Sequence, residues 1–456
     1  MVLSKHNSRR KVIALISIAI FIMILIYIGK RLTIITGYAA KGMCSSVFVA
    51  DRNPESVQQN DLNFFPVNLA TTNINTGKKE VSATIFGLAK QKAVYHEGCG
   101  CSLVSDKPTD AFPLSTRIGM KLSLNPDTIN WPAGDKLADT IPNGLQIREL
   151  KHLVDLAFDS PGKETGKQTT AIIVVYKDQL LVEKYAGGFT RKTRMLGWSM
   201  TKSIMNAMVG VLVKEKKLDI NAPVPVKEWE HDKRNHITLN NLLHMNSGLK
   251  WTENYFDLSD ATNMLFKSDQ MYNVAIHASY LYPPDSIWFY SSGTANIVSG
   301  IVRNAFSDEA TYLQFPYKTL FNSLNMRSMI LESDASGTFV GSSYSFATAR
   351  DWARFGMLYL HDGVWQGKQI LPEGWVTYST TPAKGSRGRY GAFFWLNKNK
   401  FLPDVPVDAF YCDGFKGQRV FIIPSRQLVI VRLGFSYRKF NFNEFVSSVI
   451  RTLPSH

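Results

Sequence analysis

An uncharged apolar segment lies near the N-terminus, at residues 12–28. Basic residues stand on both sides of it, at Lys5, His6, Arg9, Arg10 and Lys11 before it and at Lys30 and Arg31 after it. As a helix this segment is about 25 Å long, close to the ~30 Å hydrocarbon core of a membrane. Because the larger basic cluster precedes it, we expect a single-pass signal anchor that places the main domain on the periplasmic or extracellular side. A cleaved signal peptide is the alternative, although the segment is longer than most signal-peptide cores and lacks a clear A-x-A site.

Beyond the apolar segment, residues 36–165 contain clusters of turn-forming residues such as Asp51-Arg52-Asn53-Pro54, which predict a loop-rich extension. The pattern then changes. Two apolar stretches, 171–176 and 180–185, flank a polar turn and predict a β-hairpin. Residues 204–213 are apolar on almost every side of a helix, so we expect this helix inside the domain.

The second half of the chain predicts helices first and strands last. Thr348 to Asp351 form a capping-box pattern that begins an amphipathic helix. Apolar stretches near the C-terminus predict strands at 392–396, 418–423 and 427–434, followed by a helix from about Asn443. Strands at both ends with helices between them predict an α+β fold of the α/β-sandwich type, in which helices flank one antiparallel sheet and form a separate helical subdomain. We expect three parts, at residues 1–35, 36–165 and 166–456.

Composition and charge narrow the function. The 456 residues are 45% hydrophobic and 20% charged, which is typical of a folded protein. The net charge of +15 could attract nucleic acid, but the basic residues are scattered and no nucleic-acid-binding motif accompanies them. We therefore expect no nucleic-acid partner, and an anionic membrane surface explains the charge better.

The chain has four cysteines, Cys44, Cys99, Cys101 and Cys412. Cys99 and Cys101 are too close together for an easy mutual disulfide. In an oxidising compartment, a disulfide between Cys44 and one of these two is plausible. A zinc site of three cysteines would lack a fourth ligand at a motif spacing.

Ser199-Met200-Thr201-Lys202 is an S-x-x-K element at the start of the expected buried helix. Residues three apart share one face of a helix, so the lysine can reach the serine oxygen. If burial lowers its pKa, with Lys192 and Arg194 as candidate neighbours, it can act as the base that activates the serine. The same pattern occurs at Ser8, Ser160, Ser247 and Ser436, but only Ser199 begins a long buried helix.

Two further segments can complete a site around Ser199. Tyr290 lies between an expected short strand and an apolar helix, where its hydroxyl could point into a cleft. The segment Asp413-Gly414-Phe415-Lys416-Gly417-Gln418 precedes a strand, and its glycines allow the backbone to approach a substrate closely. A packed core tyrosine and an ordinary hairpin loop are the alternatives for these two segments.

In this order, the three elements resemble the penicillin-binding-protein and class C β-lactamase superfamily of serine hydrolases. Residues 237–249 and 346–356 resemble two further segments of that family, its "S-G" turn and its "S-T-A-R-D-L-A-R-F" helix. Gly414 to Gln418 is more similar to the G-x-H/K-G-Q element of 6-aminohexanoate-dimer hydrolases than to a lactamase K-T-G triad. The chain departs from the lactamase pattern at Ser292, which stands in place of the asparagine of Y-x-N.

The resemblance implies a β-lactamase/transpeptidase-like fold for residues 166–456 and a role for each site residue. Ser199 is expected to be the nucleophile and Lys202 its base, while Tyr290 relays a proton to the leaving group. The backbone N–H groups of Ser199 and Phe415 are expected to form the oxyanion hole. The expected substrate-binding residues are Tyr255, Gly414, Lys416 and Gly417, with Tyr255 as a lid residue and Lys416 as the partner of a substrate carboxylate.

These roles predict an amide or ester hydrolase that acts on a small amide, ester or peptide through an acyl-enzyme. No metal or organic cofactor is called for, because protein groups supply the nucleophile, base and oxyanion donors. A D,D-peptidase or weak β-lactamase with the same residues is the second hypothesis. A catalytically silent, membrane-anchored binding module is the third.

Overall fold

The computed structural model describes residues 2–104, 125–160, 165–436 and 439–454. Six strands form an antiparallel sheet in the order β12-β13-β14-β15-β5-β6. They are β5 (Thr169–Tyr176), β6 (Gln179–Tyr185), β12 (Trp395–Leu396), β13 (Phe410–Gly414), β14 (Gln418–Ile423) and β15 (Leu428–Gly434). The predicted hairpin is β5–β6, and β15 pairs with β5, Ile430 opposite Val174. The sheet is therefore completed by both ends of the main domain, as predicted.

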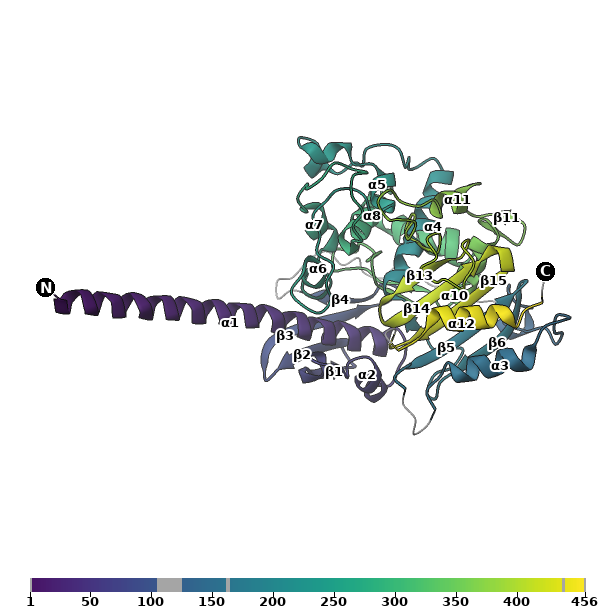
Figure 1. Cartoon of the computed structure of the whole chain (residues 1–456), viewed down its shortest axis with the longest axis horizontal. Helices are drawn as coiled ribbons and strands as arrows, with labels where there is room; N and C mark the ends of the chain where they lie inside the picture. The colour runs from purple at the N-terminus through teal and green to yellow at the C-terminus, as the bar shows by residue number, and fades with distance from the viewer. Residues whose placement is uncertain (1, 105–124, 161–164, 437–438, 455–456) are drawn as a thin grey trace.

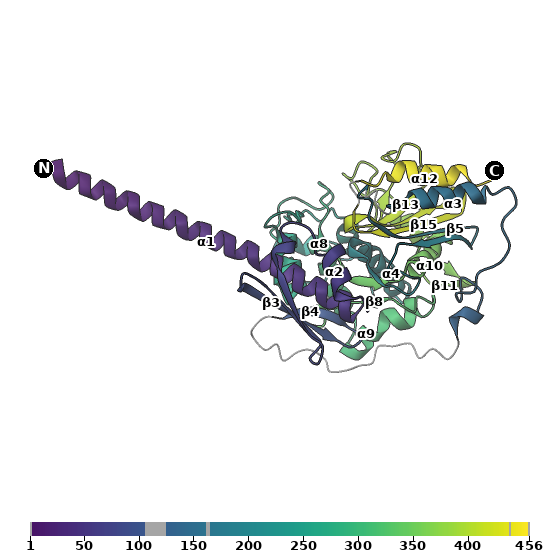
Figure 2. The same cartoon turned by 90° about the horizontal axis from the view of Figure 1, so that it is seen from below.

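Helices cover both faces of this sheet (Figure 2). One face carries α3 (Ile147–Leu156) and α12 (Phe442–Arg451), and the other carries α4 (Thr201–Lys214) and α10 (Ala349–Leu360). In β5, alternate side chains serve the two layers: Val174 packs in the core with α3 and α12, and Ile173 in the core with α4 and α10. A strand buried on both faces is apolar throughout, which explains the unbroken apolar stretch of β5. The α/β-sandwich prediction is confirmed.

A helical subdomain is inserted between β6 and α10. Its helices are α5 (Leu239–Leu243), α6 (Asp260–Lys267), α7 (Met271–Ile276), α8 (Ser292–Asn304) and α9 (Glu309–Pro316). A small sheet in the order β7-β9-β8 joins it to the main body. Its strands are β7 (Met195–Leu196), β8 (Ile330–Leu331) and β9 (Ser345–Ala347). A ribbon of β10 (Val364–Trp365) and β11 (Lys368–Gln369) follows α10, and α11 (Trp375–Ser379) comes after it.

The N-terminal helix α1 (Val2–Phe48) has two halves with different surroundings. Residues 12–28 project from the body of the molecule and are exposed or nearly so, whereas most residues from Thr36 onward are buried against β2, β3 and α6 (Figure 1). By length and composition, this helix can cross a membrane. It runs through residue 35 without a break, so the expected anchor and the start of the extension are one helix.

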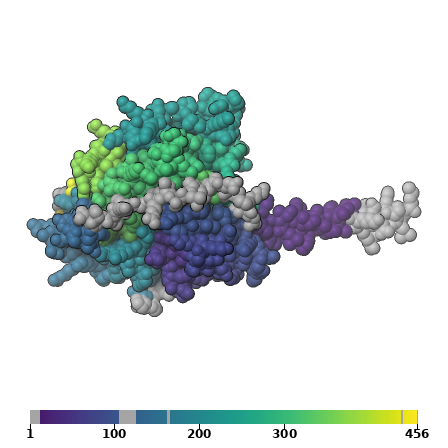
Figure 3. Space-filling view, turned by 180° about the vertical axis from the view of Figure 1, so that it is seen from behind, coloured from purple at the N-terminus to yellow at the C-terminus, as the bar shows by residue number. Residues whose placement is uncertain are grey.

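The expectation of a loop-rich extension at 36–165 is wrong for much of its described part. After α1 come α2 (Pro54–Asn60) and a four-stranded sheet in the order β1-β2-β3-β4. Its strands are β1 (Thr71–Asn75), β2 (Glu80–Ile85), β3 (Leu88–His96) and β4 (Gly100–Val104). This sheet covers the second half of α1, and the extension forms one side of the body (Figure 3). Polar side chains fill the outward positions of β1 and β3, so the strands show too few apolar residues for a clear sequence pattern.

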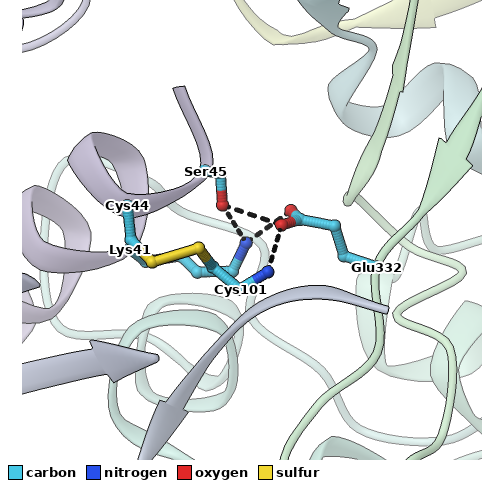
Figure 4. The surroundings of a disulfide bond; sticks show 5 residues. All are labelled: Lys41, Cys44, Ser45, Cys101 and Glu332. Atoms are coloured by element: carbon cyan, nitrogen blue, oxygen red, sulfur yellow. Dashed lines mark hydrogen bonds and ion pairs between the residues drawn. A yellow bond between two sulfur atoms is a disulfide. The ribbon is translucent and has the colours of Figure 1, made fainter. Parts of the chain in front are cut away.

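A disulfide between Cys44 and Cys101 joins α1 to β4, and Cys99 remains free and buried. The disulfide uses two of the three sulfurs of the zinc site considered above, which excludes that site. Beside it, the Lys41 ammonium lies 2.5 Å from the Glu332 carboxylate, which also accepts hydrogen bonds from Ser45 Oγ and the Cys101 N–H (Figure 4). Both ionic groups are buried. The disulfide therefore ties the second half of α1 to the sheet of the extension, and the buried ion pair ties it to the main domain.

Candidate active site

Ser199 lies in the 3-10 turn η3 (Trp198–Met200), immediately before α4. Pairing of β7 with β9 positions this turn, and the Gly197 N–H donates to the Ser345 carbonyl at 2.7 Å. Trp198 has a φ of +49°, a left-handed conformation that costs about 1–3 kcal/mol for a bulky residue. Such strain persists only where the surrounding structure enforces it, and here it presents a half-buried Ser199 at the helix N-terminus. The predicted position of Ser199 at the start of a buried helix is confirmed.

Lys202 Nζ lies 3.1 Å from Ser199 Oγ, within hydrogen-bond distance, as the i,i+3 spacing predicted. The ammonium also donates to Ser292 Oγ at 3.2 Å and to the Ser342 carbonyl at 2.9 Å. These contacts come from α8 and from the segment before β9. They hold the lysine against the serine.

Burial lowers the pKa of Lys202 from 10.5 to about 8, and the negative charge of Glu253 opposes that change. The predicted lowering is present, but its cause is burial alone. Arg194, considered above as a neighbour, instead donates to the carbonyls of Val49 and Ser328. A lysine with this pKa is neutral in a useful fraction of molecules near neutral pH.

Tyr290 lies in the irregular segment before α8 rather than at the end of a strand, and the structure brings it to the site. Its ring centroid is 4.8 Å from Lys202 Nζ, and the Ser199 side chain acts on its hydroxyl, in the direction that lowers its pKa. Burial and the charge of Glu253 raise its pKa well above 10. The phenol therefore keeps its proton at neutral pH, when the adjacent lysine can release one.

Glu253 is a site residue that the sequence analysis missed. Its carboxylate accepts hydrogen bonds from Trp251 Nε1 at 2.7 Å, Tyr255 OH at 2.5 Å, the Ser292 N–H at 2.9 Å and Ser292 Oγ at 2.5 Å. Ser292 is the first residue of α8, so Glu253 also satisfies an N–H at the positive end of a helix. Since Ser292 Oγ accepts from Lys202, a continuous hydrogen-bonded path links Glu253 to Lys202.

The end of β13 lies close to the Ser199 turn, where Gly414 meets Gly197. A Cβ on Gly414 would lie 2.2 Å from the Gly197 carbonyl, so only glycine permits this approach. It brings Phe415 next to Trp198, with ring centroids 5.6 Å apart. The Phe415 ring also lies 5.4 Å from that of Tyr255. Tyr255, Gly414 and Phe415 are thus gathered around Ser199, and Gly417 follows within η7 (Phe415–Gly417).

The structure places the Lys416 side chain elsewhere. Its ammonium donates to the Asp61 carbonyl at 2.9 Å and lies 4.4 Å from the ring centroid of Phe64. Both partners belong to the N-terminal extension, which the resemblance to the hydrolase family did not cover. The expected contact with a substrate carboxylate is not supported, because this ammonium is occupied by the contact between the extension and η7.

Comparison with known proteins agrees with this geometry. Residues 154–434 match the Beta-lactamase family. The chain is 24% identical over 301 residues to a 6-aminohexanoate-dimer hydrolase of Paenarthrobacter ureafaciens, a match that covers 58% of this chain and 72% of that protein.

Two solved structures share the fold. A Bacillus anthracis protein assigned as a 6-aminohexanoate-dimer hydrolase superposes with a TM-score of 0.56 at 21% identity, covering 71% of this chain and 87% of that chain. A family VIII carboxylesterase superposes with a TM-score of 0.52 at 15% identity, covering 70% of this chain and 100% of that chain. With the family match extending over more than half of its residues, the chain belongs to the beta-lactamase family.

Proposed function

We propose that this chain is a membrane-anchored serine hydrolase that cleaves an amide or ester bond through an acyl-enzyme on Ser199. The observation that carries the proposal is the contact of 3.1 Å between Ser199 Oγ and the buried amino group of Lys202. Similar proteins named as a 6-aminohexanoate-dimer hydrolase and a family VIII carboxylesterase support this reaction class.

In the proposed reaction, neutral Lys202 takes the proton of Ser199 while Oγ attacks the substrate carbonyl carbon. The carbonyl oxygen becomes an oxyanion, for which the N–H groups of Ser199 and Phe415 are the proposed donors. Tyr290 gives its proton to the leaving nitrogen or oxygen as the bond breaks, and recovers one from the Lys202 ammonium. Water then attacks the acyl-enzyme, and the same groups return the free acid and Ser199.

The electrostatics of the site favour this division of roles. A base must be available without its proton, and Lys202 has a pKa of about 8 because it is buried. An acid must hold its proton, and the pKa of Tyr290 is raised. Glu253 stabilises the ammonium that forms when Lys202 accepts the proton, through Ser292. Tyr255 serves as a wall of the site, held by Glu253 and Ser292.

Two other functions use the same fold. A D,D-peptidase or weak β-lactamase would keep the serine, lysine and tyrosine. A silent binding module needs none of the three, so their mutual contacts favour an enzyme.

Covalent labelling separates these functions. We expect a fluorophosphonate to label the full-length protein, Ser199→Ala to abolish both labelling and p-nitrophenyl ester hydrolysis, and the melting temperature to stay nearly unchanged. Labelling by a fluorescent penicillin as well would favour the peptidase, and labelling by neither reagent would favour the binding module. Burst kinetics retained in Ser199→Ala would identify a different nucleophile.

We also propose that α1 anchors the chain with residues 166–456 on the periplasmic or extracellular side. The basic cluster before residue 12 supports this orientation, and the Cys44–Cys101 disulfide supports an oxidising compartment. The full-length protein should stay in the membrane fraction through alkaline carbonate washing. Its release as a smaller soluble species would indicate a cleaved signal peptide instead.

A further inference from the structure

An apolar cavity of about 240 Å³ lies between α1 and the active site. One wall consists of residues of α1, namely Arg31, Ile34, Ile35 and Tyr38. A second wall consists of Trp198, Tyr255 and Phe415, and Trp198 stacks on Tyr38. Trp198 directly precedes the nucleophile, and Tyr255 and Phe415 flank it. The cavity thus borders the catalytic residues on one side and the membrane-proximal helix on the other.

The volume and lining of this cavity suit a hydrocarbon chain. Aromatic and aliphatic side chains dominate the lining, with Phe64, Phe266 and Leu258 between the two walls. An apolar cavity of about 150 Å³ already holds a molecule the size of benzene. The larger cavity here can accept several methylene groups.

Exposed apolar side chains lie at the cavity and at the turn between β2 and β3, which also contacts α1. Phe65 and Phe256 line the cavity and yet are 80% and 67% exposed. Phe86 and Leu88 stand at the turn between β2 and β3, 86% and 62% exposed, and that turn is held to α1 by a hydrogen bond from Thr36 to Ala89. Exposed apolar side chains of this kind mark surfaces that contact a membrane or another protein.

The position of the cavity along α1 follows from helix geometry. Arg31 and Tyr38 lie three and ten residues beyond the end of the apolar segment at Ile28, which places the cavity roughly 5–15 Å from the hydrocarbon core. The headgroup layer occupies about 5–8 Å on each side of a bilayer. The Lys41–Glu332 ion pair and the disulfide hold α1 rigidly, so this height is fixed. For its scissile bond to reach Ser199, a lipid has to rise out of the hydrocarbon core by at least this height. The cavity shields from water the part of the hydrocarbon chain that has left the membrane.

From these observations we infer that the substrate is an amphiphile of the membrane, a long-chain acyl ester or amide whose hydrocarbon chain occupies the cavity between α1 and Trp198. This inference rests on the proposed hydrolase activity of Ser199 and specifies its substrate class. The chain enters past Phe65 and Phe256 and reaches Ser199 with its carbonyl end.

The test compares two p-nitrophenyl esters, a butyrate and a decanoate, with full-length protein reconstituted in phosphatidylcholine vesicles. Rates are divided by the number of sites that a fluorophosphonate labels, so that poorly folded variants do not distort them. Burial of one methylene raises affinity about four-fold, so two buried methylenes predict a decanoate-to-butyrate ratio of kcat/KM above about tenfold. Ile34→Trp, which fills the cavity, and Phe256→Ser, at its mouth, should each reduce this ratio at least about fivefold.

Phe401→Ser is the matched control. Like Phe256, Phe401 is exposed and its N–H donates to an asparagine side chain two residues earlier. Phe401 lies in the loop before β13, next to residues of the core on the other face of the main sheet. The ratio should stay unchanged in this variant.

An equal loss of the ratio in Phe401→Ser would overturn the lipid inference. Hydrolysis of butyrate without any preference for decanoate would overturn it too, and would leave the hydrolase activity standing. If Ser199 takes no label and neither ester is cleaved, the proposed function itself fails and the inference fails with it.

Discussion

Replacing Glu253 by glutamine should move the pH dependence of acylation toward acid. The Glu253 carboxylate favours the charged form of Lys202 and so raises its pKa, against the larger lowering by burial. Glutamine removes that charge, and the pKa of Lys202 should then fall below its value of about 8 in the unmodified chain. Because Lys202 must be neutral to act as the base, the rising limb of the profile should follow its pKa.

The magnitude of the lysine's contribution follows from its protonation. With a pKa of about 8, Lys202 is neutral in about one molecule in ten at pH 7. The ordinary value of 10.5 would leave about one neutral molecule in three thousand, so burial increases the active fraction about 300-fold. In the unmodified enzyme, kcat/KM should rise tenfold per pH unit below about pH 8 and level off above it.

The assay is kcat/KM for p-nitrophenyl acetate between about pH 6 and about pH 10. Glu253→Gln should show an earlier midpoint and a lower plateau, since Tyr255 and Ser292 also lose an acceptor oxygen. Glu309→Gln serves as the control because it removes the same charge at a surface ion pair with Arg303. A midpoint that stays in place or moves to higher pH in Glu253→Gln would refute the electrostatic role of this carboxylate.

Three further predictions follow from the contacts of the site and of α1. Tyr290→Phe should reduce amide turnover by about 10²–10⁴ and turnover of an activated p-nitrophenyl ester far less, because p-nitrophenolate leaves without a proton; equal losses would show that Tyr290 also activates Ser199. Lys416→Met should lower the melting temperature without a selective rise in KM for substrates that carry a carboxylate, and such a rise would restore the role first expected for this lysine. Glu332→Leu should reduce the free energy of unfolding in denaturant by about 3–5 kcal/mol, and less when Lys41→Met is added, because the single change leaves a buried charge unpaired; equal losses would mean that Lys41 is hydrated.

The proposed nucleophile, base and acid could be located from sequence because their signals are local. Ser199 and Lys202 are three residues apart on one helix, and Tyr290 precedes the apolar face of another. Glu253 has no such signal: it lies in an irregular loop and reaches the site only when that loop folds across the start of α8. Glu253 is recognisable as a site residue only from the four hydrogen bonds that its carboxylate accepts. These bonds depend on the fold and not on any spacing in the sequence.

The misplaced role of Lys416 has a related cause. The motif around Gly414 and Gly417 predicts a backbone that approaches the nucleophile, and the contact between Gly414 and Gly197 agrees with that prediction. The motif does not determine the direction of the Lys416 side chain, which depends on the residues that pack beside it. Here Asp61 and Phe64 of the extension take up the ammonium, and the resemblance to other family members did not reach those residues.

The loop from Trp251 to Asp260 contacts both α1 and the candidate active site, through residues that are close together in sequence. Glu253 influences the pKa of Lys202, and Tyr255 forms part of the wall between the site and the apolar cavity. Two residues later, Asp257 accepts a hydrogen bond from Tyr27 and pairs with Arg31 at 3.3 Å, both of them residues of α1 beside the predicted membrane boundary. These last contacts are exposed, so each adds little stability. Because these contacts break more easily than the buried contacts of Glu253, we expect the outer part of the loop to open for the proposed membrane substrate while Lys202 stays in place.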